Sequence, residues 1–243
     1  MKENKYDEPL FFRKYSQMQR SVKGLEGAGE WSTLKSILPD FKDKRVLDLG
    51  CGFGWHCVYA AEQGAEAVTG IDVSEKMLDR AKTLTNARNI EYRCISIEDY
   101  EYPENSFDAT ISSLALHYVK SFEDICAKVR KCLTVGGDFI FSVEHPVFTA
   151  QGRQEWVCDD AGEHLHWPVD GYFCEGGRTA RFLDEDVIKY HRTLTSYVNG
   201  LLNHGFEIIG LREPIPPNEL LDIPGMKDEL RRPMMLIISA KKK

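Results

Sequence analysis

The chain has 243 residues, of which 42% are hydrophobic and 28% are charged, and its formal net charge at pH 7 is −7. This is an ordinary globular composition, and the length suits a single α/β domain, residues 1–243. The acidic charge argues against binding along a nucleic-acid backbone. No stretch is apolar for long enough to predict a membrane span.

The first residues, Met1–Asp7, are charged and lack the apolar stretch of a signal peptide. The seven cysteines are scattered and include no CxxC pair. We therefore expect a cytoplasmic protein whose cysteines are small buried side chains rather than disulfide partners. The sequence indicates no particular oligomeric state.

Apolar spacing predicts a helical cover over residues 1–43, with helices at Pro9–Arg20 and Glu30–Leu38. Beyond it, short apolar strands alternate with helices. The expected strands are Arg45–Leu49, Ala67–Ile71, Ile90–Ile95, Phe107–Ser112, Asp138–Val143, Phe206–Leu211 and Met234–Ala240. The expected helices are Trp55–Gln63, one capped by Ser74, Phe122–Leu133 and one from Thr193 to Asn203. This alternation predicts a doubly wound, mostly parallel seven-stranded α/β sheet with an antiparallel return at its end.

The alternation breaks at residues 144–190, which are rich in Gly, Pro, His and aromatic residues and show no sustained period. The segment is too aromatic to be disordered. It follows the carboxyl end of the fifth predicted strand, the edge at which open α/β sheets bind ligands. We interpret it as a cap inserted over a substrate.

The glycine loop DLGCGFG, residues 48–54, joins the first predicted strand to a helix and brings backbone amides to a ligand. The dinucleotide fingerprint requires a glycine three residues after Gly52, but Trp55 stands there. The Walker pattern is absent as well. Asp48, just before the loop, would disfavour a pyrophosphate and suits a ligand with an ammonium group.

Asp72 ends the second predicted strand, where a carboxylate can accept hydrogen bonds from both hydroxyls of a ribose. The alternative is an ordinary cap of the next helix. Because Ser74 already supplies that cap, ribose binding is the favoured interpretation.

Four segments in this order, VLDLGCGFG, GIDVSEKML, SFDATISSLALHYV and LTVGGDFIFSVEHP, resemble the motifs of class I methyltransferases that use S-adenosylmethionine (SAM). The likeness runs from Lys44 to His145 and is greatest to the branch with the ubiquinone/menaquinone methyltransferases and many small-molecule enzymes. It implies methyl transfer from SAM to a small-molecule acceptor. It also implies that Gly50, Cys51 and Gly52 line the methionine portion of SAM, Asp72 the ribose, and Val73 and Met77 the adenine.

The resemblance has one departure, because the family often has an acidic residue after the third strand and Ser96 stands there. The other contacts that we expect with SAM are Ile97 and Glu98 at the adenine, Ser113 and Leu114 beneath the sulfonium, and Tyr15 or Arg20 at the methionine carboxylate.

Methyl transfer requires alignment of the acceptor and, for some acceptors, removal of a proton. His145 and His191 flank the cap, and histidine exchanges protons near neutral pH. We take these two, with Tyr172 of the cap, as catalytic candidates; the alternative for each histidine is a structural hydrogen-bonding role. His117 is a weaker candidate, since the resembling motif often only packs there.

No metal is expected, because the cap residues that could bind zinc match no known ligand spacing; these are Cys158, His164, His166 and Cys174. Two other functions stay open. One is an NAD(P)-dependent oxidoreductase on the same sheet, against which Trp55 argues. The other is a non-catalytic SAM-binding regulatory domain.

Overall fold

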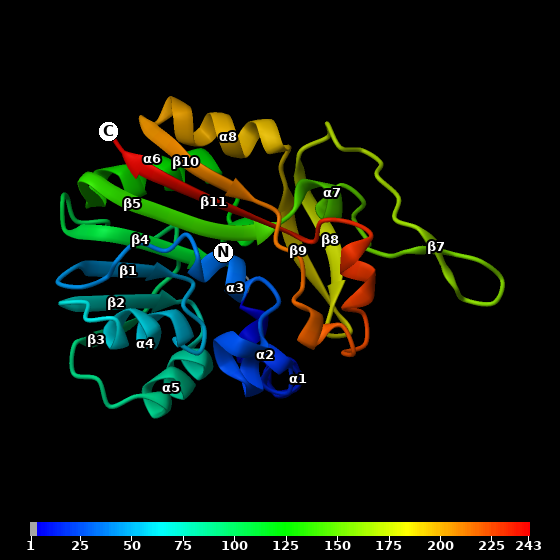
Figure 1. The fold of residues 1–243 in the computed structure, drawn as a ribbon, viewed down its shortest axis with the longest axis horizontal. Coiled ribbons are helices and arrows are strands. Elements are labelled where there is room, and N and C mark those ends of the chain that lie inside the picture. Colours follow the sequence, from blue (N-terminus) through cyan, green and yellow to red (C-terminus); the bar gives the residue numbers. More distant parts are fainter. Residues whose placement is uncertain (1–3) are drawn as a thin grey trace.

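The computed structural model describes residues 4–243, and seven of its strands form one sheet in the order β3-β2-β1-β4-β5-β11-β10 (Figure 1). The strands are β1 (Arg45–Leu49), β2 (Ala67–Asp72), β3 (Ile90–Cys94), β4 (Phe107–Ser113), β5 (Leu133–Glu144), β10 (Phe206–Arg212) and β11 (Met235–Lys242). Strands β1 to β5 are parallel, whereas β11 is antiparallel to both β5 and β10. The predicted doubly wound, mostly parallel sheet is confirmed.

Eight α-helices are found in the described residues. They are α1 (Pro9–Ser16), α2 (Gln19–Val22), α3 (Trp31–Lys35), α4 (Trp55–Glu62), α5 (Glu75–Leu84), α6 (Phe122–Cys132), α7 (Pro146–Thr149) and α8 (Leu194–Asn203). The predicted caps are present, since Ser74 accepts a hydrogen bond from the Met77 amide and Thr193 one from Ser196. The helix expected over Pro9–Arg20 is interrupted after Ser16. No helix among residues 4–243 is long and apolar enough to span a bilayer.

Alternating side chains of each strand fill two hydrophobic cores, one on each face of the sheet. Leu47 of β1 packs in the core under α6 and α8, together with Phe141 of β5. Its neighbour Val46 packs in the opposite core, which α3 and α4 cover. The sheet is therefore buried on both faces, and its free edge for ligands is the carboxyl end of the parallel strands.

The segment expected to lack regular structure contains two hairpins, β6 (Val157–Cys158) with β7 (His164–His166) and β8 (Gly176–Phe182) with β9 (Glu185–His191). The second turns at Leu183 and Asp184, with φ of 53° and 64°. Two positive φ values define a tight hairpin turn that usually shows itself as Asn-Gly or Asp-Gly. The Leu-Asp pair here carries no such signal, which is why the prediction missed the hairpin.

The N-terminal helices and the β8–β9 hairpin meet beyond the carboxyl ends of the parallel strands (Figure 1). Phe11 of α1 packs edge-on against Phe182 of β8, with ring centroids 5.8 Å apart. Lys14 forms an ion pair with Asp184 at 2.8 Å. These contacts close a cover over the edge of the sheet at which ligands bind.

Candidate active site

The glycine loop makes its close turn after β1 through three glycines with positive φ, Gly50 (74°), Gly52 (53°) and Gly54 (74°). A side chain is excluded at Gly50, because a Cβ atom there would lie 2.4 Å from the Cβ of Ala115. The amides of Gly50 and Cys51 both donate to the Ile71 carbonyl of β2 at 2.9 Å. The loop is thus fixed between β1 and β2, with its glycine backbone open to a ligand.

Asp72 joins this loop to the start of α5. Its carboxylate accepts hydrogen bonds from the amides of Gly52 and Ser74, each at 2.9 Å. Burial nevertheless raises the pKa of Asp72, against the lowering effect of these hydrogen bonds. A half-buried carboxylate in this state gains from further donors, such as the two hydroxyls of a ribose.

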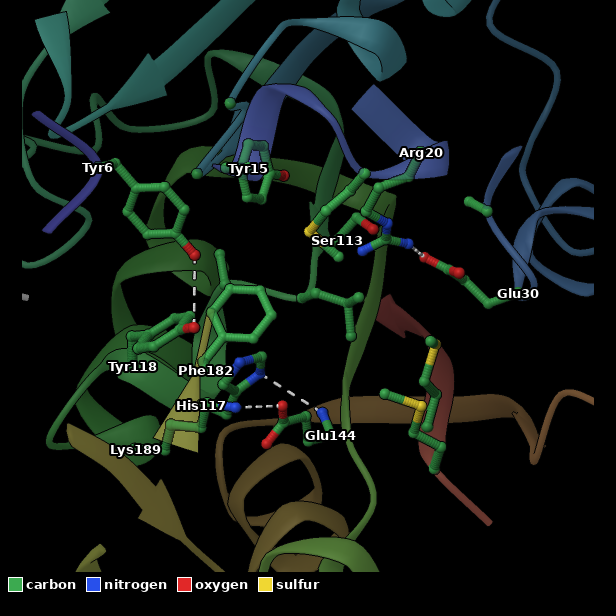
Figure 2. Close-up of a pocket in the computed structure, with 18 of the residues that line it drawn as sticks. Tyr6, Tyr15, Arg20, Glu30, Ser113, His117, Tyr118, Glu144, Phe182 and Lys189 are labelled. Carbon is green, nitrogen blue, oxygen red and sulfur yellow. Dashed lines mark hydrogen bonds and ion pairs between the residues drawn. The ribbon is translucent and has the colours of Figure 1, made fainter. Parts of the chain in front are cut away.

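The cavity above the glycine loop has a volume of about 420 Å³. One end is lined by the glycine loop, β2 and the N-terminal cover, and the other by side chains from β5, β8, β9 and the connection before β11 (Figure 2). The lining side chains at this far end are His117, Tyr118, Glu144, Phe182, Lys189, Met234 and Met235. Ile223, Met226 and Glu229 also line the cavity, and Met226 lies next to Gly29 of the N-terminal cover.

Most of the residues predicted to bind SAM line this cavity; they are Tyr15, Arg20, Gly50, Gly52, Asp72, Val73, Met77, Ile97, Ser113 and Leu114. Cys51 instead lines a neighbouring chamber of about 70 Å³. Glu98 lines a separate hollow of about 390 Å³, beyond Tyr6 and Tyr118. Residues from five separate stretches of chain are therefore brought to one cavity.

Asp48 lines none of these three cavities. It is 1% exposed, and the Cys57 thiol donates a hydrogen bond to it at 3.2 Å. Burial raises the pKa of Asp48 to about 7. The carboxyl group thus lies against Cys57 of α4 and not at the wall of any of these cavities.

The predicted catalytic side chains also lie outside the lining of the cavity. The Nδ1 atom of His145 accepts from the Val147 amide at 3.0 Å, and its Nε2 atom lies 2.9 Å from the Glu213 carboxylate. The first of these contacts is a hydrogen bond that caps α7, and the second places a carboxylate beside Nε2. Burial lowers the pKa of His145, although Glu213 opposes this.

His191 and Tyr172 hold the cap together. The His191 ring is fully buried, with Nδ1 2.7 Å from the Thr149 hydroxyl and Nε2 2.8 Å from the Tyr172 carbonyl oxygen. The Tyr172 hydroxyl accepts from the Leu194 amide at 3.0 Å. In this arrangement all three predicted catalytic groups make structural hydrogen bonds.

The far end of the cavity contains a buried ion pair that the sequence did not indicate. Lys189 of β9 lies 2.5 Å from Glu144 of β5, and their side chains are 3% and 10% exposed. Gln154 donates to the other Glu144 oxygen at 2.7 Å. Burial is the largest single influence and opposes ionisation of Glu144, but Lys189, His117 and the hydrogen bond from Gln154 together outweigh it and lower the pKa of the carboxyl. The pattern of β9, in which Val187, Lys189 and His191 are all buried, would have shown this lysine had the strand been predicted.

Two tyrosines and a histidine complete the wall between the two ends. The hydroxyls of Tyr6 and Tyr118 lie 3.4 Å apart (Figure 2). The His117 Nδ1 atom accepts from the Glu144 amide at 3.4 Å, and burial lowers the pKa of His117 to about 4. Tyr6 lies in a short turn of the N-terminal segment, where no sequence pattern marked it.

No group of three or more His, Cys, Asp or Glu side chains within residues 4–243 is arranged to hold a metal ion.

Comparison with known proteins identifies the family of this chain and the cofactor that its site binds. A methyltransferase domain family matches residues 47–141. A candidate SAM-dependent methyltransferase from Listeria monocytogenes is 58% identical, with a TM-score of 0.86 over 90% of this chain and 99% of that one. A SAM-dependent methyltransferase from Mesorhizobium loti is 41% identical, with a TM-score of 0.83 over 90% and 100% of the two chains. A ubiquinone biosynthesis O-methyltransferase from Neisseria meningitidis is 37% identical over 124 residues, which are 45% of this chain and 51% of that enzyme.

The Listeria and Mesorhizobium proteins, which are matched over nearly their whole length, have the same fold as this chain. The order of strands in its sheet is the one typical of class I methyltransferases. SAM, rather than a nicotinamide dinucleotide, is the cofactor, and the enzyme is a methyltransferase. The chain belongs to the class I SAM-dependent methyltransferases.

Proposed function

We propose that the enzyme transfers the methyl group of SAM to a small-molecule acceptor bound at the far end of the 420 Å³ cavity. The observation that carries this proposal is the enclosure of that end. Phe182 and Lys189 come from the cap hairpin, Glu144 from β5 and Met235 from β11. A site walled by such separate segments suits a small, partly apolar molecule rather than a folded nucleic acid or protein.

The residues at the near end fit the cofactor. Asp72 presents a carboxylate for the ribose, and the glycine loop leaves room for close approach of the ligand to backbone. Met77 and Ile97 offer apolar contacts to the adenine. Bound SAM supplies an activated methyl group, so the protein has to position the acceptor in line with it.

Positioning, rather than proton transfer by the far-end groups, is the proposed source of rate. At neutral pH, His117 stays neutral because its pKa is about 4, and Glu144 stays ionised because Lys189 holds its pKa low. Neither group changes charge near pH 7, where an effective general base titrates. The acceptor is accordingly expected to bring a nucleophile that is already reactive, such as an acidic hydroxyl, a carboxylate or a neutral amine.

The finer proposal is a partly apolar, planar acceptor, as in the small-molecule branch that contains the ubiquinone methyltransferases. The partial match to the Neisseria enzyme supports it, and so do Phe182, Tyr118 and the methionines of the far end. Phenols with an acidic hydroxyl, aromatic acids and aromatic amines are the first compounds to test.

The experiment measures S-adenosylhomocysteine formation with a panel of such compounds, in the wild type and in two matched variants. Phe182→Ala removes a ring that lines the cavity, whereas Phe173→Ala removes a ring that is 88% exposed on the same cap. For a compound that is methylated, we expect KM to rise about tenfold in Phe182→Ala only, as for a lost aromatic contact. Equal effects of the two variants would contradict the proposed acceptor site. Methylation of RNA or protein with no small-molecule turnover would contradict the acceptor class.

A further inference from the structure

A second chamber of about 70 Å³ opens beside the main cavity, between the glycine loop and the N-terminal cover. Its volume is several times the roughly 10–15 Å³ that one water molecule requires, so a small ionic group fits. The residues that line both spaces are Tyr15, Arg20, Ala28, Glu30, Gly50, Gly52 and Ser113. A ligand bound over the glycine loop can therefore extend one end into this chamber.

The described residues that line the chamber include one cationic and one anionic side chain, Arg20 and Glu30. They form an ion pair with each other through the Oε1 atom of Glu30 (Figure 2). His56 also lines the chamber and is neutral, because burial lowers its pKa to about 4. Burial raises the pKa of Tyr15 and of Cys51, so these two groups are neutral as well. The chamber thus offers a fixed positive and a fixed negative charge side by side.

Glu30 has an unused hydrogen-bonding atom. The residue is 2% exposed, and its Oε2 atom is buried without a hydrogen-bond partner among residues 4–243. Leaving a buried charged acceptor unsatisfied is costly. An oxygen of this kind at the wall of a chamber indicates a donor that arrives with the ligand.

The fold holds this pair in place through two close backbone contacts. A Cβ atom at Gly27 would lie 2.4 Å from the Gln19 carbonyl oxygen, so the chain folds back tightly between Arg20 and Glu30. A Cβ atom at Gly24 would lie 3.2 Å from the indole of Trp55, which fixes the same turn on α4. The charge pair is therefore built into the contact between the cover and the glycine loop.

We propose that this chamber is an α-amino-acid subsite for the methionine end of SAM, in which Arg20 binds the carboxylate and Glu30 Oε2 accepts from the ammonium group. The carboxylate and ammonium charges of SAM then alternate in sign with those of Arg20 and Glu30. The ammonium group gives Glu30 Oε2 the hydrogen-bond donor that it lacks. Glu30 takes the role that the sequence suggested for Asp48. Asp48 is hydrogen-bonded to Cys57 and lines neither space.

The test is calorimetric binding of three ligands: S-adenosylhomocysteine, its decarboxylated form, which keeps only the amine, and 5′-methylthioadenosine, which has neither charged group. In Glu30→Gln, the Kd of the first two ligands rises about tenfold, as for one lost charge-assisted hydrogen bond, and that of the third is unchanged. In Arg20→Gln, binding of S-adenosylhomocysteine weakens much more than binding of the decarboxylated ligand.

Asp48→Asn is the matched control, because it neutralises the other candidate carboxyl without changing its shape. The proposal is overturned if Asp48→Asn, and not Glu30→Gln, selectively weakens the two amine-containing ligands. It is equally overturned if Glu30→Gln weakens all three ligands alike while the protein keeps its melting temperature. These readouts concern donor binding alone, so they are independent of whether the proposed acceptor class is right.

Discussion

Lys189 on β9 and Glu144 on β5 meet as a buried ion pair, with Nζ and Oε1 2.5 Å apart, and so join the cap to the sheet at the wall of the cavity. Removing one member of such a pair leaves an unpaired charge in a site of low polarity, which typically costs about 3–5 kcal/mol. We expect Lys189→Met to lower the free energy of unfolding by this amount in urea titrations at pH 7. The double variant Glu144→Gln/Lys189→Met is expected to lose less stability than Lys189→Met, because it leaves no unpaired charge in the site. A double variant that loses the sum of both single changes would contradict this coupling.

The Glu144–Lys189 pair also predicts how the stability of the protein depends on pH in the acid range. The folded-state pKa of Glu144 is lowered, chiefly by Lys189 against the effect of burial, so its contribution to stability is present above the unfolded pKa of about 4.3. That contribution is lost as the pH falls through the lower, folded-state pKa. We therefore expect the stability difference between the wild type and Glu144→Gln to shrink below pH 4 in denaturant titrations. A difference that stays constant down to pH 2 would contradict it.

Asp48 predicts the opposite pH dependence. Its folded-state pKa is raised to about 7 by burial, against about 3.9 in the unfolded chain. Between these values the folded state binds more protons, so this group makes stability fall as the pH rises from 4 to 7. The Asp48→Asn variant removes the effect. Its free energy of unfolding should therefore increase relative to that of the wild type as the pH rises from 4 to 7, by at most ~4 kcal/mol for a shift of ~3 pKa units. Parallel stability curves for the two proteins between pH 4 and 8 would show that Asp48 is not held in this way.

Gly54 of the glycine loop and Gly136 of β5 have nearly equal positive φ, and their surroundings predict a contrast between them. Gly54 has φ of 74°, and a Cβ atom there would lie 2.2 Å from the Tyr92 hydroxyl oxygen and 2.9 Å from Cζ. Gly136 has φ of 76°, and nothing lies within 4 Å of a Cβ atom there. Gly136→Ala should therefore cost only the conformational strain of about 1–2 kcal/mol.

Gly54→Ala adds the steric clash, which we expect to cost at least ~1–3 kcal/mol more in thermal unfolding. The double variant Gly54→Ala/Tyr92→Phe should recover part of that loss, because the closest atom is gone. Equal melting temperatures for Gly54→Ala and Gly136→Ala would contradict the packing of Tyr92 on the loop.

The sequence predicted the parts of the site whose neighbours along the chain define them. Asp72 and Ser74 follow a strand and begin a helix, and both take the places in the fold that this local pattern indicated. The residues of the Arg20–Glu30 pair are 10 positions apart and those of the Glu144–Lys189 pair 45, and neither separation is a helix or strand spacing that would reveal the contact. They depend on tertiary contacts that only the folded chain shows.

The orientation of the predicted catalytic histidines could not be predicted from the sequence either. His145 and His191 stand near the cap in the sequence, but their ring orientation depends on partners such as Thr149 and Glu213. The cap itself was located by its composition, whereas its strands were missed because the turn at Leu183 and Asp184 uses residues that rarely take positive φ.

The cap is also joined to the segment of residues 213–234, which closes the cavity through Ile223, Met226 and Glu229. The Arg232 guanidinium lies 4.5 Å from the ring centroids of both Phe148 and Trp167. Contacts of this kind are worth up to about 2 kcal/mol where they are shielded from water. Arg232→Ala should therefore release the segment and open the cavity.

We expect cleavage after Glu219 and Glu229 by a glutamate-specific protease to become about tenfold faster in Arg232→Ala, because a segment that opens more often is cut more often. Arg212→Ala is the control, since that side chain is exposed and bonds only to the adjacent Leu211 carbonyl. Unchanged cleavage would mean that the contacts of Ile223 and Met226 with the rest of the cavity wall suffice to hold the segment closed.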